Sequence, residues 1–315
     1  MIDFREAGRR LADKDRSFRD KQMGLGDAVR LVHDGHDVAV GGCLYSRTPM
    51  ASLFEILRQG RTGLTLSRSL MCYEAELFMV RGAANRIVTS WVGIGLPWGI
   101  AKVFRRYVEE GRAVYEEWSH LALGLRYRAA SMGVPFLPTM SMLGSDLLAG
   151  TDAVVMDCPF TGQPLCLVPA YFPDVALIHV HRADRYGNAQ IEGYPFMDRE
   201  IGGAAQTVIV TAEEIVEPEE IVRRSDTTLL PHFVVDAVVE VPFGSFPHEC
   251  YGRYEALFSH FDEYVALIEE SGPAGVERYL ADCVDGAGDF AGFLAGFGED
   301  VLAGQRARAA ELVAG

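Results

Sequence analysis

Short apolar runs alternate with stretches of helical spacing through the first 160 residues of this chain. The runs read as strands at 37–40, 64–67 and 86–91, and helices are predicted at 49–60, 72–82, 98–111 and 119–132. Parallel strands need a crossover connection, which is usually a helix, so strict alternation favours a parallel sheet. The sequence therefore predicts an α/β fold: an open, largely parallel sheet with helices on both faces.

The second half keeps this pattern and adds antiparallel elements. Residues 174–180 form a near-continuous apolar run, which is typical of a strand buried on both faces of a sheet. Residues 184–188 are a turn cluster, after which 189–191 is predicted to return as a short hairpin strand. Two further buried strands are predicted at 207–211 and 236–241.

No clean linker interrupts the chain, which indicates one compact α/β body with helical additions at both ends. Residues 1–22 form a charged N-terminal extension. The α/β domain is expected to cover 23–265. Residues 266–315 are expected to form a helical, Gly/Ala-rich C-terminal extension.

Composition excludes several classes of function. The 29 basic and 44 acidic residues give a net charge of −15, and no Lys/Arg run is present to bind nucleic acid phosphates. No apolar stretch reaches the roughly 18 to 20 residues that span a bilayer, and no signal segment opens the chain. We therefore expect a cytoplasmic protein without nucleic-acid or membrane partners. The six cysteines are far apart and are expected to be reduced thiols, not metal ligands: Cys43, Cys72, Cys158, Cys166, Cys250 and Cys283.

The turn after the first strand is the best candidate for a ligand site. Gly41 and Gly42 allow close approach of a ligand, and the next helix is predicted to start with Thr48 as N-cap and Pro49 at its first position. The segment is neither a Walker motif nor a dinucleotide fingerprint. Arg47, just before the start of this helix, is suited to binding the carboxylate of a ligand. A tight turn without a ligand and an ordinary exposed arginine remain the alternatives.

Two histidines could suggest a metal. His179 and His181 are two apart on a predicted strand, so both imidazoles face one side, with Asp174 and Asp184 nearby. Without a third ligand at helical spacing this is a weak signal. A structural role is the better interpretation, and no metal site is predicted.

Other polar residues have ordinary explanations. Ser119 is predicted to be an N-cap, which leaves His120 in the first helical turn, where the helix dipole favours a neutral imidazole. Adjacent Ser and His side chains diverge on a helix, so they form no catalytic dyad. Glu74 and Glu76 are expected to lie on an exposed helix face.

Several blocks of sequence, in order and together covering about residues 22–265, resemble the α subunits of family I CoA transferases, particularly the glutaconate CoA-transferase branch. The blocks are 41–60, 133–138, 173–179, 209–215, 235–239 and 246–252. No single block would suffice, but their combination is specific.

The resemblance implies a homologous β subunit, an α2β2 assembly and an active site at the interface between subunits. In this family the nucleophile is a glutamate of the β subunit, and Ser67 stands at the matching position here. We therefore expect no catalytic nucleophile on this chain. The substrates would be an acyl-CoA thioester and a carboxylate, with no permanently bound cofactor. The predicted substrate-binding residues are Gly41, Gly42, Arg47, Ser67, Ser119 and His120.

Two alternatives follow from the same resemblance. Hydrolytic relatives open a steroid-derived ring in CoA thioesters and use an acidic residue of the α subunit. His120 occupies that position here, and Glu117 is three residues away. The chain could therefore belong to a CoA-thioester hydrolase or ring-opening enzyme, or be a non-catalytic subunit that binds CoA esters.

Overall fold

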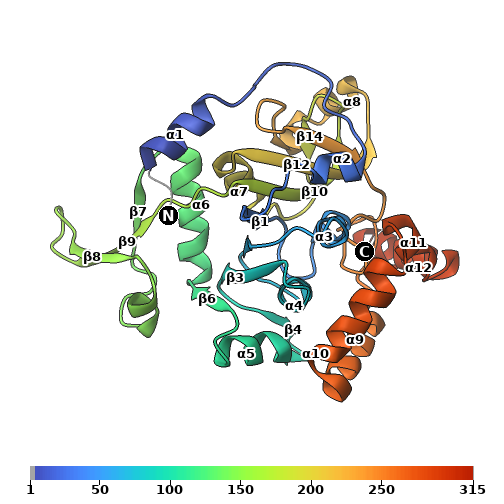
Figure 1. Cartoon of the computed structure of the whole chain (residues 1–315). Helices are drawn as coiled ribbons and strands as arrows, with labels where there is room; N and C mark the ends of the chain where they lie inside the picture. The colour runs from blue at the N-terminus through green and yellow to red at the C-terminus, as the bar shows by residue number, and fades with distance from the viewer. Residues whose placement is uncertain (1–3, 315) are drawn as a thin grey trace.

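A parallel sheet of seven strands forms the centre of the computed structural model, which describes residues 4–314 (Figure 1). The strand order is β6-β3-β2-β1-β10-β12-β14, and each neighbouring pair is parallel. The strands are β1 (Asp37–Val40), β2 (Leu64–Ser67), β3 (Ala84–Thr89), β6 (Val114–Glu117), β10 (Val175–Ala183), β12 (Thr207–Ile215) and β14 (Ala237–Glu240). The predicted fold class is confirmed.

Both faces of the sheet are buried, because successive side chains of a strand point to opposite sides. In β1, Val38 and Val40 belong to one apolar cluster, whereas Ala39 belongs to another. In β10, Val175 and Ala176 divide in the same way. This division explains why the strands read as continuous apolar runs rather than alternating ones.

Helices cover the two faces unequally. The first cluster packs against α2 (Leu25–Val29), α3 (Met50–Arg58), α4 (Glu74–Val80), α5 (Lys102–Glu109) and C-terminal helices. The second cluster packs against α6 (His120–Met132) and α7 (Asp198–Ala204). The remaining short helices are α8 (Pro218–Arg223), η1 (Asp146–Gly150) and η2 (Ser225–Thr227).

Three smaller groups of strands are antiparallel. β11 (Ala189–Gln190) returns against the end of β10, as predicted, and pairs with β13 (Thr228–Leu230). β4 (Gly93–Gly95) pairs with β5 (Gly99–Ile100). β7 (Phe136–Thr139), β9 (Pro164–Pro169) and β8 (Val154–Asp157) form a separate sheet. We call residues 136–169 the β arm, because this sheet projects from the body on the left of Figure 1.

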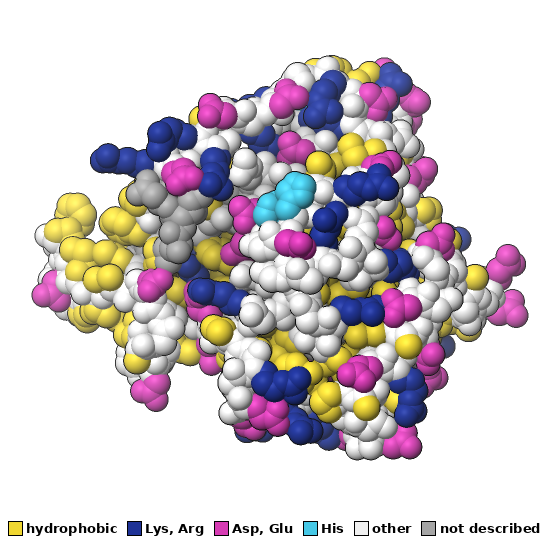
Figure 2. Space-filling model, in the orientation of Figure 1, with side chains coloured by type: hydrophobic (Ala, Val, Ile, Leu, Met, Phe, Trp, Pro, Cys, Tyr) yellow, Lys and Arg dark blue, Asp and Glu magenta, His cyan; other side chains and the backbone are white. Residues whose placement is uncertain are grey.

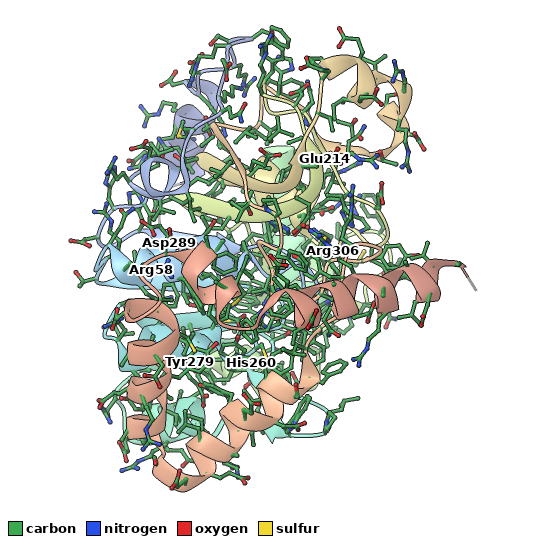
Figure 3. All side chains as sticks on the ribbon, turned by 90° about the vertical axis from the view of Figure 1, so that its right-hand side faces the viewer. Arg58, Glu214, His260, Tyr279, Asp289 and Arg306 are labelled. Carbon is green, nitrogen blue, oxygen red and sulfur yellow. The ribbon has the colours of Figure 1, made fainter. Side chains whose placement is uncertain are left out.

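The C-terminal helices cover the side of the molecule that faces the viewer in Figure 3. They are α9 (Phe258–Ser271), α10 (Pro273–Tyr279), the π-helical η3 (Leu280–Asp285), α11 (Phe290–Ala295) and α12 (Glu299–Ala314). The ring of Phe293 lies 5.0 Å from that of Phe54 in α3. Tyr279 and His260 are joined by a hydrogen bond of 2.9 Å (Figure 3). The domain boundary expected at residue 265 therefore falls inside α9, and the helices beyond it share the main core.

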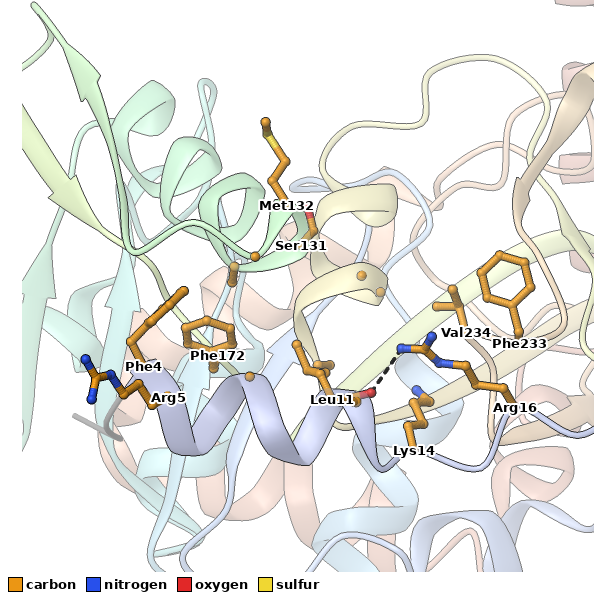
Figure 4. Close-up of a pocket in the computed structure, with 17 residues that line it drawn as sticks. Phe4, Arg5, Leu11, Lys14, Arg16, Ser131, Met132, Phe172, Phe233 and Val234 are labelled. Carbon is orange, nitrogen blue, oxygen red and sulfur yellow. Dashed lines mark hydrogen bonds between the residues drawn. The ribbon is translucent and has the colours of Figure 1, made fainter.

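The N-terminal extension lies along the body. Helix α1 (Phe4–Ala12) is followed by a segment that ends with Met23 donating its N–H to the carbonyl of Val238. A cavity of about 570 Å³ lies between α1 and the C-terminal ends of α6 and α7 (Figure 4). Phe172, which precedes β10, also lines it, so this cavity is at the amino ends of the strands.

Some predicted boundaries were wrong by a few residues. The strand expected at 86–91 lies at 84–89, and the helix expected at 98–111 is limited to 102–109. Thr48 does not cap α3, because the N-cap position is held by Pro49 and the Thr48 hydroxyl donates to the carbonyl of Leu44 at 2.8 Å. Among the described residues no helix is long and apolar enough to cross a membrane.

Candidate functional site

The order of the strands locates the site. From β1 the chain proceeds through β2, β3 and β6 to one side, and from β10 it proceeds through β12 and β14 to the other. In open α/β sheets, ligands bind at the carboxyl ends of the strands where the order reverses in this way. Gly41 and Gly42 directly follow β1 at this point, so the position of the predicted site agrees with the topology.

Gly41 and Gly42 allow this turn to pack against its own chain. Gly42 has a φ of +66°, and a Cβ atom there would lie 2.1 Å from the carbonyl oxygen of Ser46. The N–H of Gly41 donates to the carbonyl of Leu177 at 2.8 Å. The N–H of Gly42 donates to Oδ1 of Asp198 at 2.7 Å. Both glycine N–H groups are therefore already bonded within the chain.

Arg47 is buried, although the sequence suggested an open helix entrance. Its guanidinium forms an ion pair with Asp198 at 2.5 Å, and both side chains are almost wholly inaccessible. It also donates to the carbonyl of His179 at 3.1 Å and to that of Tyr194 at 2.8 Å. Arg47 thus binds a carboxylate of its own chain and ties the β1 loop (residues 41–48) to the segment before α7.

A second buried ion pair holds the other side of the β1 loop. Arg68 and Glu74, both fully buried, lie 2.7 Å apart. Arg68 also donates to the carbonyl of Gly41 at 3.1 Å and to the hydroxyl of Thr48 at 3.0 Å. The expectation that Glu74 lies on an exposed helix face is wrong, because its carboxylate compensates this buried guanidinium.

Glu76 is also buried, and the prediction of exposure is wrong for it too. Its carboxylate accepts the backbone N–H groups of Val103 at 2.7 Å and Phe104 at 3.0 Å, at the start of α5. The first N–H groups of a helix have no partner inside the helix, and the N-cap Ala101 provides none. The hydroxyl of Tyr264 donates to the same carboxylate at 2.7 Å. Burial raises the pKa of Glu76 despite these bonds.

Ser67 lies at the end of β2 but its hydroxyl does not face the β1 loop. It donates to Oδ1 of Asp37 at 3.3 Å, near the beginning of β1. Asp37 is partly buried and also accepts the hydroxyl of Tyr171. Burial raises the pKa of Asp37 to about 7, and the hydrogen bond from Tyr171 opposes this rise. The structure therefore places the Ser67 hydroxyl toward the beginning of β1, away from the β1 loop.

Ser119 and His120 form a second group at the end of β6. Ser119 caps α6 as predicted, since its hydroxyl accepts the N–H of Ala122 at 3.1 Å. Its oxygen also lies 2.5 Å from that of Ser141 in the β arm. Burial lowers the pKa of His120, which favours the neutral imidazole expected from the helix dipole. β6 is the third strand from β1, so this group lies roughly 15 Å from the β1 loop.

Two groups of metal-ligand side chains lie near the β1 loop: Cys72, Glu74 and His248, and His179, Glu213 and Cys250. In the first group Arg68 already neutralises Glu74, and the buried His248 ring, whose pKa is lowered by burial, stacks on Tyr73 at 5.4 Å. Neither ring nitrogen of His248 has a hydrogen-bond partner among residues 4–314.

In the second group both ring nitrogens of His179 are used. They bond to Thr211 at 2.9 Å and to Glu213 at 2.7 Å. Burial raises the pKa of Glu213, but the bond from His179 and those from Phe243 and Tyr254 hold it below the ordinary value. His181 accepts the N–H of Glu192 at 3.1 Å and bonds to the Tyr251 carbonyl. These contacts fit the structural role predicted for both histidines.

A cavity of about 490 Å³ adjoins the segment that Arg47 holds. Gly193 and Pro195, on either side of the Arg47 acceptor Tyr194, contribute to its wall. Its charged lining residues are Arg199, Arg224, Glu192 and Asp226, and Arg224 is paired with Glu192 at 3.0 Å. Ile191, Leu229 and Tyr251 contribute apolar surface. Sequence reasoning missed this cavity, because its walls come from segments separated by up to 60 residues.

Residues 23–241 match the Coenzyme A transferase family, and the chain belongs to it. It is 34% identical to a subunit of the glutaconate CoA-transferase of Acidaminococcus fermentans, over 84% of this chain and 89% of that protein. It is also 34% identical to a subunit of the 3-oxoadipate CoA-transferase of Pseudomonas knackmussii, over 87% of this chain and 97% of that protein. The family predicted from the sequence is confirmed.

Solved structures agree with this assignment. The crystal structure of glutaconate CoA-transferase from Acidaminococcus fermentans superposes with a TM-score of 0.85 at 30% identity, over 90% of this chain and 94% of that chain. The crystal structure of a variant of the decarboxylase AibA/AibB superposes with a TM-score of 0.72 at 31% identity, over 83% of this chain and 98% of that chain. The chain spans 62% of the length of an uncharacterized Archaeoglobus fulgidus protein with which it shares 39% identity.

Proposed function

We propose that this chain is the α subunit of a heteromeric acyl-CoA:carboxylate CoA transferase whose β subunit supplies the nucleophilic glutamate. One observation carries the proposal: the buried carboxylates around the β1 loop are already engaged. Asp198 pairs with Arg47, Glu74 pairs with Arg68, and Glu213 accepts from His179. A nucleophilic carboxylate needs a free lone pair aimed at the thioester, so these contacts support a nucleophile that another chain supplies.

The proposed chemistry divides one acyl exchange into balanced steps. The partner's carboxylate attacks the thioester carbonyl, which forms an acyl-glutamyl anhydride and releases CoA thiolate. The thiolate then attacks the glutamyl carbonyl, which gives a glutamyl-CoA thioester and frees the first carboxylic acid. The incoming carboxylate reverses these steps and leaves as the new acyl-CoA, so ping-pong kinetics are expected.

In this proposal the substrates bind in a crevice between the two subunits, and the α chain provides the fixed half of that crevice. Gly41, Gly42 and Arg47 form its floor, with Arg47 acting as a positioning residue through Asp198 and the carbonyl of Tyr194. The 490 Å³ cavity beyond Tyr194 takes the acyl group, and Arg199 offers a charge for a second carboxylate on that group. Names of relatives such as glutaconate and 3-oxoadipate CoA-transferase point to the same substrate class, dicarboxylic acids.

Ser67, Ser119 and His120 were predicted as substrate-binding residues too. Their positions support an indirect role for Ser67, whose hydroxyl lies away from the β1 loop, and a role at the outer rim for Ser119 and His120. We further propose an α2β2 assembly with both subunits in the cytoplasm. CoA phosphates are expected to rest mainly on the partner, because this chain has a net charge of −15.

The experiment is an assay of the purified complex of this chain with its β subunit. An acyl-CoA such as glutaconyl-CoA is supplied with and without a carboxylate acceptor such as acetate. The proposal predicts that CoA moves to the acceptor and that little free CoA appears without it. Release of free CoA at the same rate in both reactions would contradict a transferase.

The hydrolase alternative is favoured by one observation. A relative from Rhodococcus jostii, named as part of a cholesterol ring-cleaving hydrolase, shares 28% identity with this chain over 87% of its length. Glu117 is exposed at the end of β6, and His120, whose pKa is lowered by burial, follows in the first turn of α6. These two residues would then act as bases on water, and Glu117→Gln would abolish acceptor-independent turnover while leaving a transferase unaffected.

A further inference from the structure

The β arm exposes apolar side chains to an extent that is unusual for a folded chain. Phe160 at its tip is 94% exposed, and three consecutive residues of β8, namely Val154, Val155 and Met156, are between 42% and 59% exposed. Figure 2 shows hydrophobic side chains gathered on the left, where Figure 1 places β8 and β9. Contiguous apolar surfaces of this kind mark interaction sites.

β8 is open on both faces and along one edge. Neighbouring residues of a strand point to opposite faces, so exposure of both Val154 and Val155 means that neither face of β8 is covered. Within the described part of the chain β8 pairs only with β9, which leaves a row of backbone groups without a strand partner. A strand of this kind is a template for pairing with another chain.

The root of the arm, in contrast, is firmly packed. Met142, Cys166 and Val168 are buried in the second apolar cluster, and Leu147 packs against it. Ser141 is held to the cap of α6 through Ser119. The exposed tip is therefore presented on a fixed base at the carboxyl end of β6, beside the rim of the proposed crevice.

The charge of the arm indicates what can cover it. Its acidic residues are Asp146, Asp152 and Asp157, and it has no Lys, Arg or His between 136 and 169. Two copies that paired through β8 would bring Asp152 and Asp157 of both arms to one interface, with no cation of either arm to offset them. Like charges brought together at an interface are destabilising, so two arms repel.

We propose that the β arm docks into an apolar groove of the β subunit that is rimmed by Lys and Arg residues. β8 adds its free edge to a strand there, and Phe160 fills a pocket in the groove. This inference rests on the proposed function, because it requires that a β subunit exists. Docking next to Ser119 brings the partner over the carboxyl ends of the strands, where its glutamate is needed.

The test is native mass spectrometry and a binding titration of this chain with its β subunit. The variant Val155→Lys/Phe160→Ser places a cation against the basic rim and empties the pocket. We expect its Kd for the β subunit to rise at least 100-fold. The matched control is Val222→Lys, at an apolar residue of α8 that is 72% exposed, and its Kd should stay within twofold of wild type.

A second variant tests the charge argument. Asp152→Asn/Asp157→Asn should weaken the complex about tenfold at low salt and much less at high salt, because exposed charges are screened. Circular dichroism and the urea midpoint of each free variant show whether it is folded. Loss of assembly with an unchanged midpoint supports docking.

Other outcomes overturn the proposal. Assembly of Val155→Lys/Phe160→Ser as tight as wild type, with CoA transfer intact, would reject the arm but leave the proposed function standing. Self-association of the wild-type chain that this variant abolishes would assign the arm to a second copy. If the wild-type chain forms no complex and no CoA-dependent activity is found, the proposed function fails first.

Discussion

The β1 loop and the β arm are built in opposite ways. The loop has two buried ion pairs, Arg47–Asp198 and Arg68–Glu74, and its glycine N–H groups are bonded within the chain. The arm has a packed root, but its tip is apolar and exposed on both faces. The polar groups of the loop are compensated within the chain, whereas the apolar tip of the arm is exposed to solvent.

In the proposed function, this difference would let the chain form one half of an active site. A buried ion pair fixes geometry at the expense of desolvation, so it suits a loop that must stay in place when the partner arrives. An apolar arm contributes little to the fold of its own chain and can give its burial energy to assembly. The comparison predicts different consequences for mutations in the two regions.

The largest effect is expected from Asp198→Ala. The change leaves the buried guanidinium of Arg47 without its carboxylate and the N–H of Gly42 without its acceptor. Removal of one partner from a buried pair costs about 3 to 5 kcal/mol. Urea unfolding of the chain measures this loss.

The double variant Arg47→Met/Asp198→Leu is the matched control for that change. Because no unpaired charge remains, it should recover a large part of the lost stability. A double variant that is as unstable as the single one would show that the pair itself is not the source of the effect. CoA transfer should remain impaired in both variants, since the β1 loop loses its tie to Tyr194.

Asp37→Asn should change how stability depends on pH. Burial raises the pKa of Asp37 to about 7 in the folded chain, above the usual 3.8. The unfolded chain releases this proton at lower pH than the folded chain, so stability falls as pH rises from about 4 through 7. The difference between the folded and unfolded pKa of Asp37 corresponds to a loss of about 4 kcal/mol in folding stability across this pH range.

The neutral asparagine cannot ionise, so this contribution to the pH dependence should disappear in the variant. Unfolding measured at pH 4.5 and pH 7.5 should show wild type losing stability relative to Asp37→Asn. A constant difference between the two proteins at both pH values would contradict the raised pKa.

A smaller effect is expected from Ser119→Ala, at the junction between body and arm. The N-cap bond to Ala122 and the contact with Ser141 are both lost. Loss of an N-cap costs about 1 kcal/mol. Thermal unfolding checks this value, and Ser119→Asp, which restores a capping oxygen, should regain most of it.

The smallest effect on the free chain is expected at the tip of the arm. Val155→Lys should leave the free energy of unfolding within about 0.5 kcal/mol of wild type, because an exposed side chain has little packing to lose. Together with the large loss for Asp198→Ala, this result would confirm the contrast between the regions. A loss of more than about 2 kcal/mol would mean that the tip is packed in solution.

Strand periodicity predicted most of the central sheet. The runs at 37–40, 64–67 and 207–211 lie within observed strands, and the apolar run at 174–180 proved to be buried on both faces. These predictions succeeded because a strand between two helical layers is buried on both faces and is therefore rich in apolar and β-branched residues. Ser119 was recognised as a cap because its bond to Ala122 is local in sequence.

The buried ion pairs could not be predicted, because their partners are distant in sequence. Arg47 meets Asp198 across 151 residues, and nothing near Arg47 shows that its entrance is closed. Glu76 reads as exposed on the helical pattern of 72–82, but α10 packs against α4 and Tyr264 reaches the carboxylate from α9. Only the assembled fold shows these charges to be compensated.

The most direct test of this account is to locate the acyl-enzyme intermediate. The complex with the β subunit is incubated with acyl-CoA and reduced with borohydride, and both chains are mapped by peptide mass spectrometry. The account predicts a reduced glutamate on the partner and none on this chain. A reduced glutamate or aspartate in this chain, Glu117 included, would contradict the claim that it forms the half of the site without the nucleophile.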